Sequence, residues 1–370
     1  MKKKFILIIA FLFISATYAQ KNKLNLLIGT YTQGCDSKGI YVYDFDSKTG
    51  DFNLKNTSAP TVNPSFLTVS NDNKFVYAVN EFGSKSSVSA FSYDASSAQL
   101  QLLNTQPSEG ADPCHIITDG PNVMVANYSG GSITVFKKKS DGSLSAANQL
   151  ISHKGKGPNT QRQEGPHVHM LHFSPDKKYA LATDLGTDTV TLYAYNPNSE
   201  KDVLTQTAVV AVKSGSGPRH LTFSPNGKYM YLLQELTAAL SVFEYGNGQL
   251  KLIQETSLLS PDFKGSFSAA DLHFSLDGKF LYASNRGEAN TISIFKVEKN
   301  GLLKGQEHQS SLGKGPRNFV IDPSGNFLLV GHQYTNEVVV FKRNKKTGSL
   351  TATGEKISLC APVCLVFTKQ

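Results

Sequence analysis

Short apolar strands alternate with tight turns along almost the whole chain. A strand typically ends at a turn of Ser-Pro-Asp-Gly-Lys type, and a second strand with an aromatic start follows it. The clearest copy runs from Phe223 to Tyr229, where Pro225 and Gly227 fix the backbone of the turn. After the first twenty residues no stretch has a convincing helical period, so the pattern predicts strands throughout. Further copies of the turn begin at Val69, Thr118, Phe173, Phe274 and Ile321.

The turns recur about every 50 residues, and each interval has room for four short strands. A period of this length built from four strands is typical of one blade of a β-propeller. In one interval the predicted strands cover 219–223, 228–234, 240–245 and 250–258, with Gly246-Asn247-Gly248 as a hairpin turn.

Six such units are complete between residues 63 and 359, and strands are left over at both ends of the chain. Residues 361–367 are predicted to form the first strand of a blade, and residues 24–59 contain the other three, at 24–30, 39–44 and 52–57. Sharing a blade between the two ends closes the ring and removes an open sheet edge. The prediction is therefore an all-β fold, a seven-bladed β-propeller of four-stranded blades, its last blade closed by the N- and C-terminal strands.

The first nineteen residues have the pattern of an export signal. A basic start, Lys2 to Lys4, precedes an apolar run from Phe5 to Ile14 that is too short to span a bilayer comfortably. The small residues at Thr17 and Ala19 predict cleavage after Ala19, which leaves the propeller as one domain over residues 20–370. The alternative is an N-terminal helix that remains as an anchor. Cleavage predicts a periplasmic or secreted protein with no membrane contact afterwards.

Charge gives little indication of a macromolecular partner. Cleavage removes three lysines and no acid, so the formal charge falls from +8 to +5. The remaining lysines are scattered, and no basic stripe with interleaved aromatic residues is present in the sequence. We therefore expect no nucleic-acid partner, and a monomer that binds a small molecule.

The cysteines bear on closure of the ring. Cys35 falls in the shared blade, close to Cys360 and Cys364, and export permits disulfides. A disulfide from Cys35 to the C-terminal pair is therefore open. Cys360 and Cys364 have no partner pair elsewhere, so a zinc site is not expected.

The predicted fold places candidate chemistry on one face. Loops that lead from one blade to the next and loops between the second and third strands emerge together, and in this chain they are irregular and polar. The turns on the other face are nearly uniform, which indicates a structural role, whereas binding residues favour irregular loops on a rigid scaffold. The candidate residues on the polar rim are Glu81, His167, His169, Arg219, His220, Glu235, Arg286 and Arg317.

Histidine, arginine and glutamate together suit water activation or proton transfer. Glu or His can serve as a base, and Arg can hold an anion or a developing oxyanion. The structural alternatives are open: Arg219, Arg286 and Arg317 could form channel salt bridges to Glu81, Glu235 or Asp271, and His220 and His273 could be satisfied core histidines. Asp184 and Asp188 are expected to cap the turn around Gly186.

A metal site is a weaker alternative. His167 and His169 share one strand face, yet no carboxylate is obviously placed as a third ligand. We therefore expect no metal and no cofactor. A Ser-His-Asp triad lacks support because the chain has no Gly-x-Ser-x-Gly motif.

Several motifs, in order along the chain, resemble the lactonase family of seven-bladed propellers. This family holds the propeller-type 6-phosphogluconolactonases and the fungal 3-carboxy-cis,cis-muconate lactonizing enzymes, and the resemblance covers essentially all of residues 20–370. The motifs are Asn63-Pro64-Ser65-Phe66, Gly165-Pro166-His167-Val168-His169, Asp184-Leu185-Gly186-Thr187-Asp188, Gly217-Pro218-Arg219-His220, Glu235-Leu236, Ala269-Ala270-Asp271-Leu272-His273 and Ser284-Asn285-Arg286-Gly287.

The resemblance implies catalytic roles for His169, Arg219, Glu235 and Arg286, with His167 as the competitor for the first role. The remaining candidates, His167, His220, Arg317 and Glu81, are then expected to bind substrate. The implied activity is metal-free opening of a sugar lactone, with Glu235 or His169 activating water. A muconate-type cycloisomerase and a non-catalytic propeller that binds glycans or proteins are the alternatives.

Overall fold

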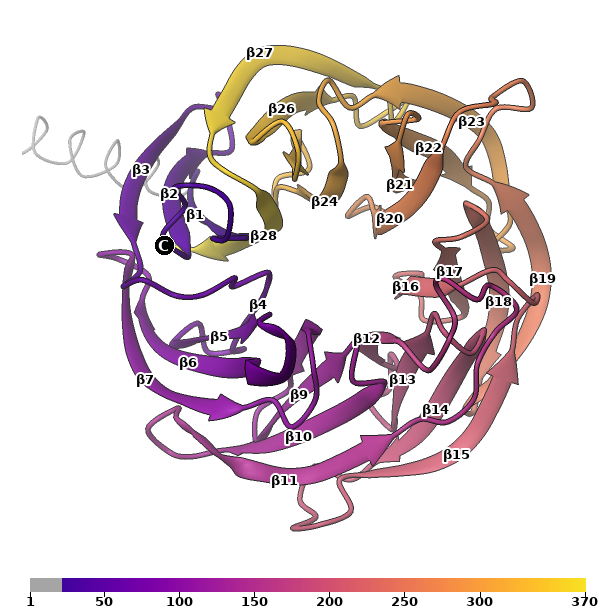
Figure 1. Cartoon of the computed structure of the whole chain (residues 1–370). Helices are drawn as coiled ribbons and strands as arrows, with labels where there is room; N and C mark the ends of the chain where they lie inside the picture. The colour runs from indigo at the N-terminus through magenta and orange to yellow at the C-terminus, as the bar shows by residue number, and fades with distance from the viewer. Residues whose placement is uncertain (1–21) are drawn as a thin grey trace, which may run out of the picture.

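The structure is a computed structural model that describes residues 22–370 as a ring of seven four-stranded sheets (Figure 1). The predicted seven-bladed propeller is confirmed. The predicted signal peptide lies outside the described residues. Within those residues, no helix has the length and apolar character needed to cross a membrane.

Each sheet runs outward from the centre of the ring (Figure 1). The innermost strands are β4 (Phe66–Val69), β8 (Pro113–Thr118), β12 (Val168–Phe173), β16 (Pro218–Phe223), β20 (Phe267–Phe274), β24 (Pro316–Ile321) and β28 (Pro362–Lys369). The second strands are β5 (Phe75–Asn80), β9 (Asn122–Asn127), β13 (Tyr179–Asp184), β17 (Tyr229–Gln234), β21 (Phe280–Gly287), β25 (Phe327–His332) and β1 (Lys23–Thr30).

The outer half of each sheet completes the blade. The third strands are β6 (Ser87–Asp94), β10 (Ser132–Lys138), β14 (Thr189–Tyr195), β18 (Ala239–Gly246), β22 (Thr291–Val297), β26 (Glu337–Arg343) and β2 (Tyr41–Asp46). The outermost are β7 (Gln99–Pro107), β11 (Leu144–Ser152), β15 (Leu204–Ala211), β19 (Gln249–Ser257), β23 (Leu303–Ser310), β27 (Leu350–Ser358) and β3 (Phe52–Thr57). A short 3-10 turn, η1 (Gly83–Lys85), follows β5.

The core lies between neighbouring blades. A second strand such as β9 is buried along its whole length, whereas an outermost strand such as β19 has no buried position. Between two adjacent blades, for example, Phe280 and Tyr282 pack with Phe319 and Phe341. Apolar burial of this kind stabilises by roughly 25 cal/mol per Å², and it holds the innermost strands at fixed spacing.

The repeated turns are held by their first side chain. Ser224 Oγ contacts Asn226 Oδ1 at 2.6 Å and accepts the backbone N–H of Tyr229 at 3.1 Å. In the sixth complete unit Asp322 takes the same role and accepts the N–H of Phe327 at 2.7 Å. Either residue satisfies a backbone donor at the start of the following strand, so the sequence can vary there without changing the turn.

The two ends of the chain share one sheet, in the order β28-β1-β2-β3. Strands β1 and β28 pair antiparallel, with Leu26 opposite Phe367, and the indigo and yellow ribbons meet there (Figure 1). A disulfide joins Cys35 to Cys360, whose Cα atoms are 6.2 Å apart. The sequence left the disulfide partner of Cys35 open, and the structure shows that it is Cys360. Cys364 is a buried free thiol in β28.

Strand β2 begins two residues later than predicted. The second strand of the N-terminal segment was expected at 39–44 and lies at Tyr41–Asp46. Gly39 has φ +148°, and its carbonyl accepts the Thr30 hydroxyl at 2.7 Å rather than a ladder bond. The glycine therefore belongs to the loop that leads into the strand.

Candidate functional site

A cavity of about 550 Å³ opens on the face where the interblade loops and the loops between second and third strands meet. Five of the eight candidate residues line it: Glu81, His169, Glu235, Arg286 and Arg317. Each lies in an innermost or second strand or directly after one. The other lining residues are Asp112, Cys114, Tyr128, Ser129, Arg162, Ser268, Gly287 and Tyr334.

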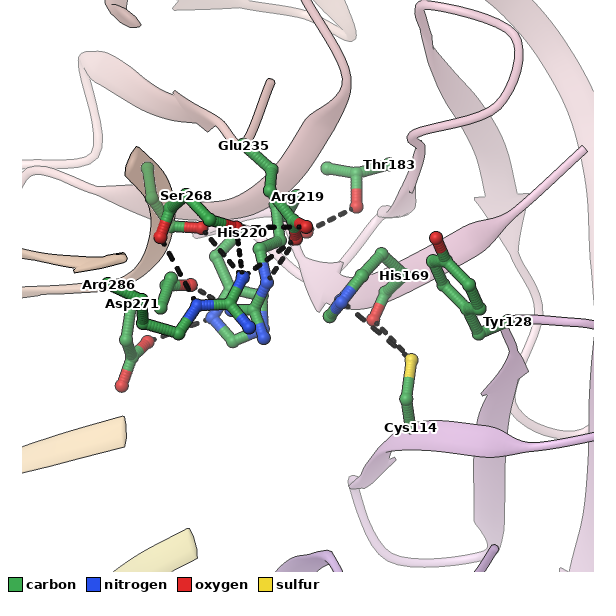
Figure 2. A network of polar contacts seen from close by, with 12 residues as sticks. Cys114, Tyr128, His169, Thr183, Arg219, His220, Glu235, Ser268, Asp271 and Arg286 are labelled. Atoms are coloured by element: carbon green, nitrogen blue, oxygen red, sulfur yellow. Dashed lines mark hydrogen bonds and ion pairs between the residues drawn. The ribbon is translucent and has the colours of Figure 1, made fainter. Parts of the chain in front are cut away.

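Glu235 lies among three arginines, of which Figure 2 labels Arg219 and Arg286. Its carboxylate is 2.9 Å from Arg219 Nε, 3.2 Å from Arg286 Nη2 and 2.7 Å from Arg162 Nη2. The Ser268 hydroxyl also donates to it at 3.2 Å and accepts from Arg286 Nη2 at 2.7 Å. Glu235 is thus the shared anion that allows several guanidinium groups to lie together.

The arginines decide the protonation of this carboxyl. Burial alone would raise the pKa of Glu235, but attraction by Arg286, Arg219 and Arg162 outweighs it and holds the pKa well below its usual range. Burial and the neighbouring Arg286 lower the pKa of Arg219, although an arginine stays charged at neutral pH. Glu235 is therefore a firmly ionised group and a weak proton acceptor.

Glu81 has a different environment across the cavity. Its carboxylate accepts the Tyr31 hydroxyl at 3.1 Å and also the Ser65 hydroxyl. Burial raises the pKa of Glu81, and the opposing attraction of Arg317 does not cancel this effect. Arg317 lies over the Tyr31 ring at 5.5 Å, and within residues 22–370 no carboxylate forms an ion pair with it.

His169 belongs to a second group that faces the arginines (Figure 2). Its Nδ1 is 3.8 Å from Cys114 Sγ, and its ring packs edge-on against Tyr128 at 5.5 Å. Burial, together with Arg219 and His220, lowers the pKa of His169 well below its usual value. The imidazole is therefore neutral near pH 7.

The other three candidates lie outside the cavity lining. Arg219 is only 2% exposed. Its Nε contacts Glu235, and its Nη1 donates to the Ala270 carbonyl. His167 stacks on Tyr128 at 4.5 Å, and its Nδ1 lies 3.0 Å from the Tyr128 carbonyl. Arg219 and His167 therefore lie behind the residues that line the cavity.

His220 and His273 share the carboxylate of Asp271 deeper in the channel. His220 Nδ1 is 2.8 Å from Asp271, and burial with the neighbouring Arg219 lowers the pKa of His220 to about 4. Its interpretation as a satisfied core histidine is confirmed. His273 also contacts Asp271, at 2.9 Å, but its side chain is 41% exposed, so the core interpretation is wrong for this residue.

The two aspartates near Gly186 act differently. Asp184 Oδ1 accepts the N–H groups of Gly186 and Thr187 at 3.0 and 3.1 Å, which confirms the predicted cap. Asp188 instead accepts the N–H of Gly215 at 2.6 Å and of Gly217 at 2.8 Å. The prediction for Asp188 is wrong because this carboxylate faces the next interblade loop, where two glycine N–H groups need an acceptor.

Arg162, Tyr31 and Ser268 are site residues that the sequence analysis did not identify. Arg162 lies in the long loop between β11 and β12, where its Nη2 reaches Glu235 and also the Tyr128 hydroxyl at 3.2 Å. The extra length of that interval was the available signal. Among the described residues, His167 and His169 do not form a group of three possible metal ligands.

Residues 25–367 match the family described as "Lactonase, 7-bladed beta-propeller". The chain belongs to this family. The predicted resemblance is thereby confirmed over nearly all of the described chain.

Similar proteins align with this chain over nearly the whole length of both sequences. A 6-phosphogluconolactonase of Bacillus subtilis is 36% identical over 348 residues, which cover 93% of this chain and 98% of the relative. A solved structure of a candidate 6-phosphogluconolactonase from Bacteroides fragilis is 44% identical, with TM-score 0.90 and coverage of 94% and 98%. A periplasmic gluconolactonase structure from Pseudomonas aeruginosa is 36% identical, with TM-score 0.89 and coverage of 93% and 99%.

Proposed function

We propose that the protein is a lactone hydrolase that opens a sugar-acid lactone in the 550 Å³ cavity. The observation that carries the proposal is the pairing in one cavity of guanidinium groups with a carboxylate whose pKa is raised. Arg286 and Arg317 line the cavity and can hold the lactone carbonyl, and Glu81 lines it as a proton acceptor. Ester hydrolysis needs these two functions together.

The reaction proceeds through water attack. Glu81 takes a proton from water while the water oxygen bonds to the lactone carbonyl carbon, and Arg286 and Arg317 stabilise the oxyanion that forms. The ring C–O bond then breaks, and the ring oxygen receives the proton from Glu81. The product is an open hydroxy acid, and Glu81 is again a carboxylate.

Glu81 replaces the two bases inferred from sequence. Glu235 has its carboxylate engaged by three arginines and its pKa lowered, so it accepts protons poorly. His169 is neutral but has a strongly lowered pKa, whereas an efficient base has a pKa closer to the working pH. We assign Glu235 and Arg219 to holding Arg286 in place, and His169 to contact with the bound substrate.

The family match and the relatives named as 6-phosphogluconolactonases support hydrolysis over the cycloisomerase and the non-catalytic binding propeller. We also propose that the chain is exported after cleavage behind Ala19, in line with the periplasmic gluconolactonase among its structural neighbours. Its substrates would then be unphosphorylated aldonolactones. Mass spectrometry of the N-terminus of the mature protein tests the cleavage directly.

The test of function is a lactone-opening assay on the mature protein. Glucono-1,5-lactone and its 6-phosphate are compared, with the uncatalysed rate subtracted, in the presence and absence of a chelator. We expect hydrolysis that the chelator does not change and that Arg219→Ala and Glu235→Gln reduce strongly. Full activity of both variants, or no turnover of either lactone, contradicts the proposal.

A further inference from the structure

A second cavity, of about 820 Å³, adjoins the first. The two share Glu81, Asp112 and Tyr334, so they form one continuous depression on the same face. The first cavity already has the size of a small-molecule site, about 300–1000 Å³, and accommodates a single sugar ring by itself. The second cavity therefore offers space that a monosaccharide lactone leaves empty.

The two cavities differ in charge. Arg162, Arg286 and Arg317 line the first, whereas Lys, Arg and His are absent from the described residues that line the second. The second cavity presents the carboxylates of Glu81 and Asp112 with amide side chains such as Gln33 and Gln333. Carboxylates and amides accept hydroxyl hydrogen bonds, and carboxylates repel anions. The second cavity thus suits a neutral polyhydroxylated group and not a phosphate.

Aromatic side chains border this polar surface. Phe82 is 45% exposed and Tyr334 is 63% exposed, values that leave large ring faces open to solvent on a folded protein. An exposed aromatic face offers apolar area to the C–H face of a sugar while polar neighbours bind its hydroxyl groups.

The loops around the second cavity are firmly held. Asn63 accepts the N–H of Thr32 at 2.8 Å, and the Cys35–Cys360 disulfide fixes the end of the same loop. In the loop that carries Phe82, the Phe82 N–H donates to the Ser86 hydroxyl at 2.8 Å. The Gly83 N–H donates to the Asp112 carboxylate at 2.7 Å. A pre-formed site of this kind loses little conformational entropy when a ligand binds.

We propose that the second cavity is a subsite for a neutral sugar ring, so that the substrate class is the aldonolactone of an oligosaccharide. The lactone ring lies among Glu81, Arg286 and Arg317, and a glycosidically linked sugar extends over Phe82. This inference rests on the proposed lactone hydrolysis, because it deepens the substrate of the same site.

The test compares kcat/KM for glucono-1,5-lactone with that for lactones of glucose disaccharides, α- and β-1,4-linked and β-1,6-linked. We expect kcat/KM for at least one disaccharide lactone to exceed that for the monosaccharide lactone by about three- to tenfold, the value of one good aromatic contact. Phe82→Ala should remove most of this advantage and leave the monosaccharide rate within about twofold. Leu276→Ala, which truncates an exposed apolar side chain elsewhere, is the matched control and should change neither rate.

The outcomes separate the two proposals. Hydrolysis of the monosaccharide lactone, with no disaccharide advantage and no effect of Phe82→Ala, overturns the subsite and leaves lactone hydrolysis standing. A preference for the 6-phosphate that Phe82→Ala abolishes overturns the neutral-sugar assignment. If no lactone is opened, the proposed function fails, and calorimetric titration with the disaccharide aldonic acids decides the subsite: binding weakened by Phe82→Ala supports it, and no binding refutes it.

Discussion

Glu81 and Glu235 are two carboxylates of one cavity with opposite surroundings. Glu235 has three guanidinium groups within 3.2 Å, and its pKa is held low. Glu81 has neutral hydroxyl donors, Tyr31 and Ser65, and its pKa is raised by burial. Two carboxylates whose environments separate their pKa values usually divide the work, one as a fixed anion and one as a proton carrier.

Glu81→Gln is expected to lower kcat by about 100-fold or more, because general-base catalysis commonly contributes 10²–10⁴. Only the carboxylate accepts a proton, so the wild-type rate should rise as pH increases through the raised pKa of Glu81 and level off above it. The kcat of Glu81→Gln and the pH profile of kcat/KM are measured for these two expectations. Thermal unfolding checks that the variant is folded. Glu355→Gln, on the exposed outer edge, is the control. A variant that keeps the acid limb of the profile would rule out Glu81 as its source.

At the residue scale, the register of the repeats identified the candidate site residues that lie on strands. Arg219, Arg317 and His169 occupy equivalent positions near the start of β16, β24 and β12, so counting from the turns found them. Tyr31 directly follows β1, at the position that Glu81 and Glu235 hold after β5 and β17, so the register could have found it. Arg162 lies in a loop without a repeat register. Arg162 is 73 positions from its partner Glu235, and the contact depends on the path of the loop rather than on any periodicity.

At the scale of elements, the sequence located the strands well and the loops poorly. Strand β17 begins one residue after its predicted start and β19 one residue before, because strong alternation and tight turns limit register errors. The loop from 153 to 167 contains no such pattern. Its shape depends on Gln163, which is fully buried and donates to the Leu185 carbonyl at 2.9 Å and to Asp188 at 2.8 Å.

Gln163→Ala is expected to lower kcat/KM by about tenfold or more, because a small displacement of a positioned group costs that much. The loss of activity acts through Arg162, because the buried side chain of the adjacent Gln163 holds Arg162 against Glu235. The decisive measurement is a double-mutant cycle: in an Arg162→Ala background, Gln163→Ala should have no further effect on kcat/KM. Gln161→Ala, two positions before Gln163 and exposed, is the matched control. Additive losses in the cycle would show that Gln163 acts independently of Arg162.

For the whole molecule, counting strands was sufficient to predict ring closure. Six complete units left three strands at one end and one at the other, and the structure pairs β1 with β28. The choice of disulfide partner could not be made in the same way, since Cys360 and Cys364 are only four positions apart. The structure separates them because Cys364 Sγ faces inward and accepts the Leu67 N–H at 3.3 Å, whereas Cys360 lies in the loop beside Cys35.

The disulfide is expected to stabilise the ring by about 2–5 kcal/mol, since it links residues 325 positions apart and so restricts the unfolded chain strongly. Reductant should therefore lower the Tm of the mature protein by several degrees, and Cys35→Ser should lower it by a similar amount. Cys364→Ser should retain the full response to reductant, because that thiol is not bridged. The three proteins are compared by thermal unfolding with and without dithiothreitol. A response that survives in Cys35→Ser would mean that the reductant acts elsewhere, and an unchanged Tm in the wild type would mean that strand pairing between β1 and β28 closes the ring unaided.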